Sequence, residues 1–236
     1  LQFSYNFQYK HSKTDNTAFD MPQDWKIDAG TDGGTLNSNL SKSATYNYYN
    51  HKMDLSFRWL REKMHFNAGV SFQPQHSTLT YSQGNYQVDT TRNVFNFTPT
   101  LDFRYKFSKT SQLRIRYRGR SSQPDMIDLL PITDNITVGN PGLKPAFTNE
   151  LRMEYNIFKP ETQRGMFSFF NFRNVLNDIS NQKIYNEETG GYTTTPENIN
   201  GNWNLFGIVG TNTALRNKKY TINTFTRTNY QNMVSY

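Results

Sequence analysis

Apolar and polar residues alternate along most of this chain. In the first ten residues, Leu1, Phe3, Tyr5, Phe7 and Tyr9 stand at odd positions with polar residues between them. The longest alternating stretch covers residues 95–107. Successive side chains of a β-strand point to opposite faces, so this pattern predicts strands with one apolar and one polar face. It returns at 53–59, 64–72, 113–118 and 151–157, and less cleanly at 165–176, 200–215 and 220–230, which makes about nine strands.

The connections between these strands are of two kinds, which follow one another in turn. Short polar turns stand at Leu60–Lys63, Ser108–Ser111, Lys159–Arg164 and Arg216–Lys219. Long connections span roughly 11–43, 74–92, 121–147 and 177–199. Loops beyond about 12–15 residues are uncommon in compact domains, whereas transmembrane β-barrels have short turns on one side and long loops on the cell-surface side. The pattern therefore favours an all-β fold, an antiparallel up-and-down meander that forms a segment of a large transmembrane β-barrel.

The physics of the bilayer supports this interpretation. Hydrocarbon cannot satisfy backbone N–H and C=O groups, so only helices and closed sheets span it, and a tilted strand needs ~9–11 residues to cross. Soluble β-sandwiches and lipocalin-like barrels alternate in the same way around a core, and they remain the alternative. A polar face rich in Arg and Asn, with the regular order of turns and loops, favours the membrane barrel. Pro99 argues against it, because proline removes a hydrogen bond from a central strand.

Composition narrows the function classes. The 236 residues include 15% aromatic residues, no cysteine and a net charge of +7. The missing cysteines exclude disulfide scaffolds, zinc–thiolate sites and cysteine nucleophiles, and the aromatic content argues against disorder. The basic residues alternate with apolar ones along strands and form no nucleic-acid-binding motif. We therefore expect no nucleic acid as a partner, and outer-membrane lipid instead.

Candidate chemistry is sparse. A row of four arginines, Arg114, Arg116, Arg118 and Arg120, occupies one face of a single predicted strand. Guanidinium groups suit carboxylates, so the row is a candidate contact for an anionic substrate or for a plug inside the barrel. The alternative is a hydrated lumen wall whose arginines pair with carboxylates on neighbouring strands, such as Asp102 and Glu154. We favour this second interpretation.

Other polar groups carry less information. The first long connection holds Asp15, Asp20, Asp24, Asp28 and Asp32 without the spacing of a calcium loop, and a solvated loop explains them better. The four histidines have no metal-ligand spacing, and no nucleophile elbow or phosphate loop occurs. We expect no enzymatic activity, no metal and no cofactor.

A more specific pattern covers residues 93–158. A strand that ends in Tyr105-Lys106-Phe107-Ser108 leads through a tight turn to the arginine strand, and a loop from Pro124 to Pro131 follows. After that loop comes a motif made of Gly139, Asn140, Pro141, Gly142, Leu143, Lys144 and Pro145. This stretch resembles the barrel of TonB-dependent receptor-like outer-membrane proteins of the Bacteroidota type. Proline at Pro99 is also familiar there, whereas Ala146 stands where that family usually has Glu.

The resemblance carries expectations for the whole protein. It implies a barrel of about 22 strands with a plugged lumen, in the outer membrane of a Gram-negative bacterium. Residues 1–236 are then a partial barrel domain, without the plug and the remaining strands, and a piece of a longer polypeptide. The function implied is uptake of a scarce small nutrient with energy supplied through TonB. The nutrient itself is not visible, and a structural or adhesive barrel and a soluble β-sandwich binding module are the alternatives.

Aromatic residues near the short turns complete the set of candidates. Trp59, Tyr105, Phe107 and Tyr220 all stand within a few residues of such a turn. Transmembrane barrels carry girdles of aromatic residues where the strands leave the hydrocarbon. We therefore expect these four side chains to lie at the inner membrane interface.

Overall fold

The computed structural model describes residues 1–24, 30, 33–125, 127–129, 133–134, 137–185, 187, 190–215 and 219–235. Its main feature is a nine-stranded antiparallel sheet in which each strand lies beside its neighbour in the chain. The strands, in order across the sheet, are β1 (Gln2–Asn16), β4 (Lys42–Leu60), β5 (Met64–Gln83), β6 (Tyr86–Ser108), β7 (Ser111–Ser122), β10 (Ala146–Lys159), β11 (Arg164–Leu176), β14 (Asn202–Ala214) and β15 (Thr221–Asn232). The predicted meander of nine strands is confirmed.

The long connections contain the remaining elements. A four-stranded sheet combines β12 (Asp178–Tyr185), β13 (Tyr192–Ile199), β9 (Thr137–Val138) and β8 (Thr133–Asp134). The strands β2 (Phe19–Asp20) and β3 (Thr35–Leu36) form a small pair, and a 3-10 turn, η2, covers Ile127–Leu129. No helix in the described part of the chain has the length and apolar character needed to cross a membrane.

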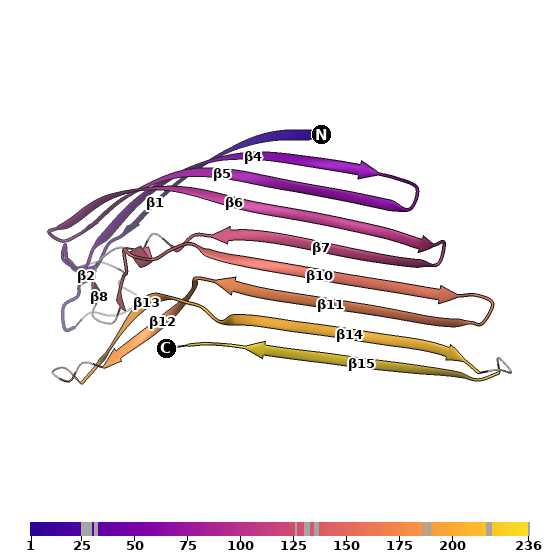
Figure 1. The fold of residues 1–236 in the computed structure, drawn as a ribbon. Helices are drawn as coiled ribbons and strands as arrows, with labels where there is room; N and C mark the ends of the chain where they lie inside the picture. The colour runs from indigo at the N-terminus through magenta and orange to yellow at the C-terminus, as the bar shows by residue number, and fades with distance from the viewer. Residues whose placement is uncertain are drawn as a thin grey trace. The chain divides into compact units, whose positions relative to one another are not determined.

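The chain divides into two compact units. The first unit comprises Leu1–Ser4, Asp54–Ser71 and Phe97–Tyr236, and the second comprises Tyr5–Met53 and Phe72–Asn96. In the first unit, the β4–β5, β6–β7 and β10–β11 turns lie at one end of the sheet, where β14 also ends and β15 begins, and we call it the turn end (Figure 1). The β12–β13 hairpin lies at the opposite end of the same unit (Figure 1). This is the arrangement that the alternation of turns and loops predicts for the two long connections of this unit.

Strand register explains how the alternation builds two different faces in the first unit. Leu101 of β6 is opposite Tyr117 of β7, which is opposite Leu151 of β10, and Leu151 is opposite Phe172 of β11. The apolar residues thus gather on one side, the apolar face. Arg116 shares the other side with Asp102 and Arg152, its partners on β6 and β10. We call this other side the charged face.

The apolar face lacks the cover that a soluble protein would give it. Phe97 is 44% exposed, Phe107 53%, Leu151 36% and Phe172 38%. The inner faces of a β-sandwich interdigitate to form a core, and large exposed apolar patches mark a surface for lipid or a partner. The exposure of these side chains therefore favours a membrane barrel over the sandwich alternative.

One predicted loop is wrong. Residues 74–92 are not a long connection, because β5 and β6 continue through them and meet at a two-residue turn, Gly84–Asn85. Gly84 has φ +57°, which glycine adopts without strain. Gly-Asn between two alternating runs is itself a hairpin signal. The connection 11–43 is likewise shorter than predicted, since β1 extends to Asn16 and β4 begins at Lys42.

Pro99 is accommodated inside the sheet by a glycine. A Cβ atom at Gly119 of β7 would lie 2.9 Å from the Pro99 ring and 2.6 Å from the end of the Phe147 ring. The bare backbone of Gly119 thus provides the space into which both rings pack. This packing explains how the ring of Pro99 fits inside a central strand, and the hydrogen bond that proline removes from the ladder stays lost.

Candidate functional site

The four arginines of β7 lie on the charged face, and two of them pair with carboxylates on the neighbouring strands. Arg114 donates two hydrogen bonds to Asp102 of β6, with 3.0 Å between Nε and Oδ1. Arg116 forms an ion pair with Glu154 of β10. All four side chains are about one-third exposed or less, so each pair is partly shielded from water. Removing one partner would leave the other charge uncompensated.

The other two arginines are in a different situation. Arg118 and Arg120 are exposed, and neither forms an ion pair or a side-chain hydrogen bond with another residue that the structure describes. Arg118 is opposite Glu150 in the register, but that carboxylate accepts hydrogen bonds from Arg152 of its own strand, at 2.9 Å from Nε. The row is therefore divided into a paired half nearer the turn end and an unpaired half nearer the long loops.

This division gives the halves different chemical capacities. Arg114 and Arg116 already bind the carboxylates of Asp102 and Glu154. These ion pairs connect β7 to β6 on one side and to β10 on the other. Arg118 and Arg120 present guanidinium groups that no described side chain occupies, and their planar donors match a carboxylate or phosphate. From the sequence, Asp102 and Glu154 could be predicted as partners of the row, but not which arginines they would bind.

An aromatic cluster on the charged face was missed by the sequence analysis. The Phe169 and Phe206 rings meet at 6.0 Å, and Arg227 of β15 lies 5.1 Å from the Phe206 ring. The Phe167 ring lies directly over Gly210, and a Cβ atom added at Gly210 would be 2.1 Å from that ring. The signal was the consecutive pair Phe169-Phe170, because neighbouring residues of a strand face opposite sides. Apolar residues at both positions place an aromatic ring on each face.

The motif at 139–145 ties two long connections together. Asn140 Nδ2 donates to the carbonyl of Pro196 in β13 at 3.1 Å, and Asn140 Oδ1 accepts from the N–H of Gly142 at 2.8 Å. Asn198 of β13 accepts from the Lys144 N–H at 2.7 Å and donates to the Lys144 carbonyl at 3.0 Å. Leu143 is only 5% exposed. The motif thus forms an anchor for the loops, which we call the loop anchor.

The aromatic residues expected at the interface all flank the turn end. Trp59 is 46% exposed and Tyr220 65%, and Arg61 lies 5.8 Å from the centre of the Trp59 ring. Tyr105 contacts Phe107 with 4.9 Å between the ring centres. Exposed rings beside short turns are typical of an aromatic girdle. Their position relative to lipid stays a prediction.

Two of the acidic residues of the first long connection, Asp15 and Asp20, are hydrogen-bonded to polar neighbours. Asp15 accepts a hydrogen bond from Ser43 at 2.7 Å, and Asp20 accepts from Asn37 at 2.9 Å. Asp28 and Asp32 lie outside the described residues. Within the part of the chain that the structure describes, no three His, Asp or Glu side chains gather closely enough to hold a metal ion.

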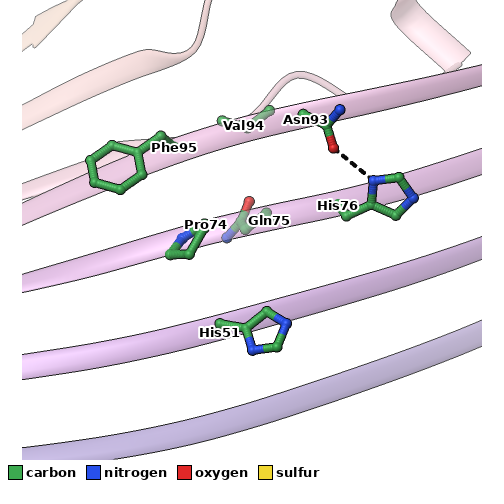
Figure 2. A pocket seen from close by; sticks show the side chains of 7 residues that line it. All are labelled: His51, Pro74, Gln75, His76, Asn93, Val94 and Phe95. Atoms are coloured by element: carbon green, nitrogen blue, oxygen red, sulfur yellow. Dashed lines mark hydrogen bonds between the residues drawn. The ribbon is translucent and has the colours of Figure 1, made fainter.

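Two histidines border a hollow in the second unit. The hollow has a volume of about 360 Å³ and is lined by His51, Pro74, Gln75, His76, Asn93, Val94 and Phe95 (Figure 2). His76 Nδ1 and Asn93 Oδ1 are 2.6 Å apart, and His51 Nδ1 is 2.8 Å from the Tyr5 hydroxyl. Each imidazole is thus engaged with a neighbouring strand. These contacts give both histidines a structural role, which is to connect neighbouring strands of the sheet.

Comparison with known proteins places this fold. The solved structure "Copper transporter OprC" superposes with a TM-score of 0.56 at 13% identity, over 90% of this chain and 33% of that chain. The ferric-catecholate import receptor Fiu from E. coli K12 has a TM-score of 0.43 at 10% identity, over 95% of this chain and 35% of that chain. The chain thus spans about one third of the length of these structures. At such identities the likeness concerns the fold alone.

The family assignment comes from the sequence. A search of curated proteins found no match. The model of the outer membrane protein beta-barrel family matches residues 1–235, which is nearly the whole chain. The two-faced antiparallel sheet agrees with this match, and the chain belongs to the outer membrane protein beta-barrel family, whose members reside in the outer membrane of Gram-negative bacteria.

Proposed function

We propose that this chain is part of an outer-membrane transporter barrel that takes up a scarce nutrient with energy supplied through TonB. The observation that carries the proposal is the unpaired half of the arginine row, Arg118 and Arg120, on the charged face. A wall with a purely structural role needs no unpaired guanidinium groups. Residues that face a barrel lumen, in contrast, determine which molecules pass, because substitutions there change selectivity. The resemblance of residues 93–158 to TonB-dependent receptors and the fold shared with a copper transporter support it.

In this proposal, residues 1–236 are one partial barrel domain. Its apolar face contacts lipid, and its charged face lines the lumen. The plug and the TonB complex are partners of the whole protein, through parts outside this chain. Arg118 and Arg120 contact either an anionic nutrient or an acidic surface of the plug. The chain has no enzymatic role in this scheme.

The test compares cells that lack the gene with cells that carry the full-length protein. Uptake of a catecholate iron chelate, of cobalamin and of a defined oligosaccharide is measured with and without a protonophore. We expect the full-length protein to restore uptake of one of these probes, and the protonophore to abolish it. If uptake of the restored probe survives collapse of the proton gradient, a passive barrel is the better explanation.

A variant pair then tests the arginines. Arg118→Gln removes one unpaired guanidinium and is expected to lower uptake of the restored probe several-fold. The matched control is Arg58→Gln, which removes an exposed arginine of β4. Equal uptake by both variants at equal amounts in the membrane would show that the unpaired half of the row has no part in transport.

A further inference from the structure

Six residues of the charged face form one continuous row close to the turn end. Each residue is directly opposite the next in the strand register, from β6 across the sheet to β15. In order, the row consists of Lys106, Gln112, Asn156, Phe167, Gly210 and Phe225. Neighbouring strands lie about 4.8 Å apart, so the row is roughly 24 Å long. It begins with a cation, continues with two amides and ends with two aromatic residues on either side of a glycine.

Two adjoining hollows follow this row. One hollow, of about 660 Å³, lies at the β6 end, and the other, of about 490 Å³, lies at the β15 end. Thr110 and Asn156 line both hollows, so the two meet in the middle of the row. We call the two hollows together the turn-end groove.

The β6 half of the turn-end groove is cationic. Lys63 and Lys109 line it together with Lys106, and Glu62 is the one carboxylate in its described lining. In the described part of the chain, no ion pair or side-chain hydrogen bond involves these three lysines. The Lys106 N–H donates to the Lys63 carbonyl at 2.7 Å, which connects the two turns that carry the lysines. Three ammonium groups are thus available to an anionic group of a ligand.

The β15 half of the groove is aromatic, and its described lining contains no charged side chain. Phe158, Phe167 and Phe225 line it and are 46%, 45% and 64% exposed, although they lie on the charged face. The Phe167 ring lies over Gly210 and is 6.5 Å from the ring of Phe225. Large apolar side chains that gather in an exposed patch mark a binding surface. These rings can pack against an aromatic or other apolar side chain of a ligand.

Amide side chains connect the two halves. Gln112 and Asn156 stand in the middle of the row, and neither forms a side-chain hydrogen bond with a described residue. Asn212 and Asn223 line the aromatic half, where they share one hydrogen bond at 2.8 Å. A side-chain amide carries donors and an acceptor together, and a peptide group also has one of each. The groove thus offers hydrogen-bond partners for the peptide groups of an extended chain.

The distance between the two halves limits what can occupy both. Lys106 and Phe167 are three strand spacings apart, which is roughly 14 Å. An extended peptide advances about 3.3–3.4 Å per residue, so an acidic side chain and an aromatic side chain about four residues apart match this distance. A small anion with a single ring is too short to reach both halves.

We propose that the turn-end groove binds an acidic oligopeptide, which is the nutrient that the barrel takes up. An Asp or Glu carboxylate lies among Lys63, Lys106 and Lys109, and an aromatic side chain about four residues further along packs against Phe167 and Phe225. Charge complementarity, the spacing of the two halves and the amides between them favour a peptide over a neutral saccharide. The inference rests on the proposed function, in which the charged face lines the lumen.

The test measures peptide binding to the full-length protein in maltoside detergent by isothermal titration calorimetry. The first probe is acetyl-Asp-Asp-Gly-Gly-Gly-Phe-amide, and the second has Asn in place of both Asp residues. Exposed ion pairs contribute modestly, so the acidic peptide is expected to bind about tenfold more tightly than the Asn peptide. A third probe, acetyl-Asp-Asp-Phe-Gly-Gly-Gly-amide, has the same composition but cannot reach both halves, and it is expected to bind about fivefold more weakly than the first.

Two variants assign these preferences to the groove. Lys63→Gln/Lys106→Gln/Lys109→Gln should bind the acidic peptide about tenfold more weakly and the Asn peptide unchanged, which also shows that the variant is folded. The matched control, Lys10→Gln/Lys144→Gln/Lys183→Gln, removes three exposed lysines elsewhere and should keep the preference. Phe225→Leu should weaken both peptides equally, about threefold, and Phe170→Leu, on the apolar face, should weaken neither.

Several results would overturn the proposal. They are absence of peptide binding, equal affinity for the two peptide spacings, and equal binding of the acidic peptide by the lysine variant and its control. Tetragalacturonate is tested in parallel, and tighter binding of this saccharide than of any peptide would assign the groove to an acidic saccharide instead. A passive barrel can still bind the peptide, and a transporter of another nutrient can fail to bind it, so this inference and the proposed function fail separately.

Discussion

Asn198 provides the sharpest test of how the long loops are held. Its side chain accepts a hydrogen bond from the Lys144 N–H at 2.7 Å and donates to the carbonyls of Lys144 and Asn177 at 3.0 and 2.9 Å. The amide thus satisfies backbone groups of two segments that have no ladder partner there. We expect Asn198→Ala to release the loop anchor while the nine-stranded sheet stays intact.

The size of the effect follows from these contacts. A hydrogen bond between neutral groups contributes about 0.5–1.5 kcal/mol net. Asn198 is half-buried, so the lower part of this range applies, and three bonds give roughly 2 kcal/mol. Cleavage of a transiently opened segment follows its equilibrium population when reclosing is fast. A loss of about 2 kcal/mol therefore raises the cleavage rate roughly 30-fold.

The assay is limited proteolysis of the full-length protein in detergent, with the cut sites identified by mass spectrometry. Cuts in 121–147 and 177–199 should become faster, and cuts at the turn end should not. The control is Asn181→Ala, an exposed residue of β12 without a side-chain hydrogen bond to any described residue. If Asn198→Ala and Asn181→Ala are cleaved at the same rate, the loop anchor contributes nothing to loop stability.

Three further predictions test the faces, the packing and the loop electrostatics. Fluorophores on Leu101→Cys and Thr98→Cys, unambiguous in a chain without cysteine, should report an apolar and a wet environment respectively, and the reverse would refute the lipid-facing assignment. Gly119→Ala should destabilise the protein in urea by about 1–3 kcal/mol, because the rigid ring of Pro99 cannot yield to a Cβ at 2.9 Å. Burial and then the charge of Asp125 raise the pKa of the Asp128 carboxyl. The protonated Asp128 carboxyl therefore stabilises the folded loop fully below the ordinary pKa of 3.8, and this stabilisation is lost as the pH rises through the raised pKa. Asp128→Asn should accordingly flatten the pH dependence of loop cleavage.

The strands near the turn end were predictable because lipid imposes a strict pattern on them. Each strand that crosses hydrocarbon must show an apolar residue at every second position, and β6, β7 and β10 do so. Beyond the bilayer this constraint ends. The strands β5 and β6 contain 20 and 23 residues, about twice the ~9–11 needed to cross. Their extensions alternate only briefly, with Leu79 and Tyr81 before the turn and Tyr86 and Val88 after it, and the polar residues around these positions make the segment look like a loop.

The candidate site was predictable only in part, for a similar reason. Alternation alone places the arginines of β7 on the same face as Asp102 and Glu154, so pairing could be expected. Which arginine stays unpaired depends on competition within β10. Glu150 binds Arg152, two residues along the same strand and on the same face, and so it does not neutralise Arg118. Such a choice between nearby partners is decided by side-chain geometry, which a pattern of residue types does not contain.

The many asparagines of the chain have a common physical role in this architecture. A sheet with lipid on one face and water on the other has little interior, and among the described residues the long connections bury few apolar side chains, such as Leu143 and Ile199. An amide carries both donors and an acceptor, so it can replace a missing strand partner. Asn198 does this in the loop anchor, and Asn212 and Asn223 join across β14 and β15 at 2.8 Å. Amide contacts thus stabilise the loops and the wet face as apolar packing stabilises a soluble domain, which explains why the mean hydropathy of the whole chain is as low as −0.81.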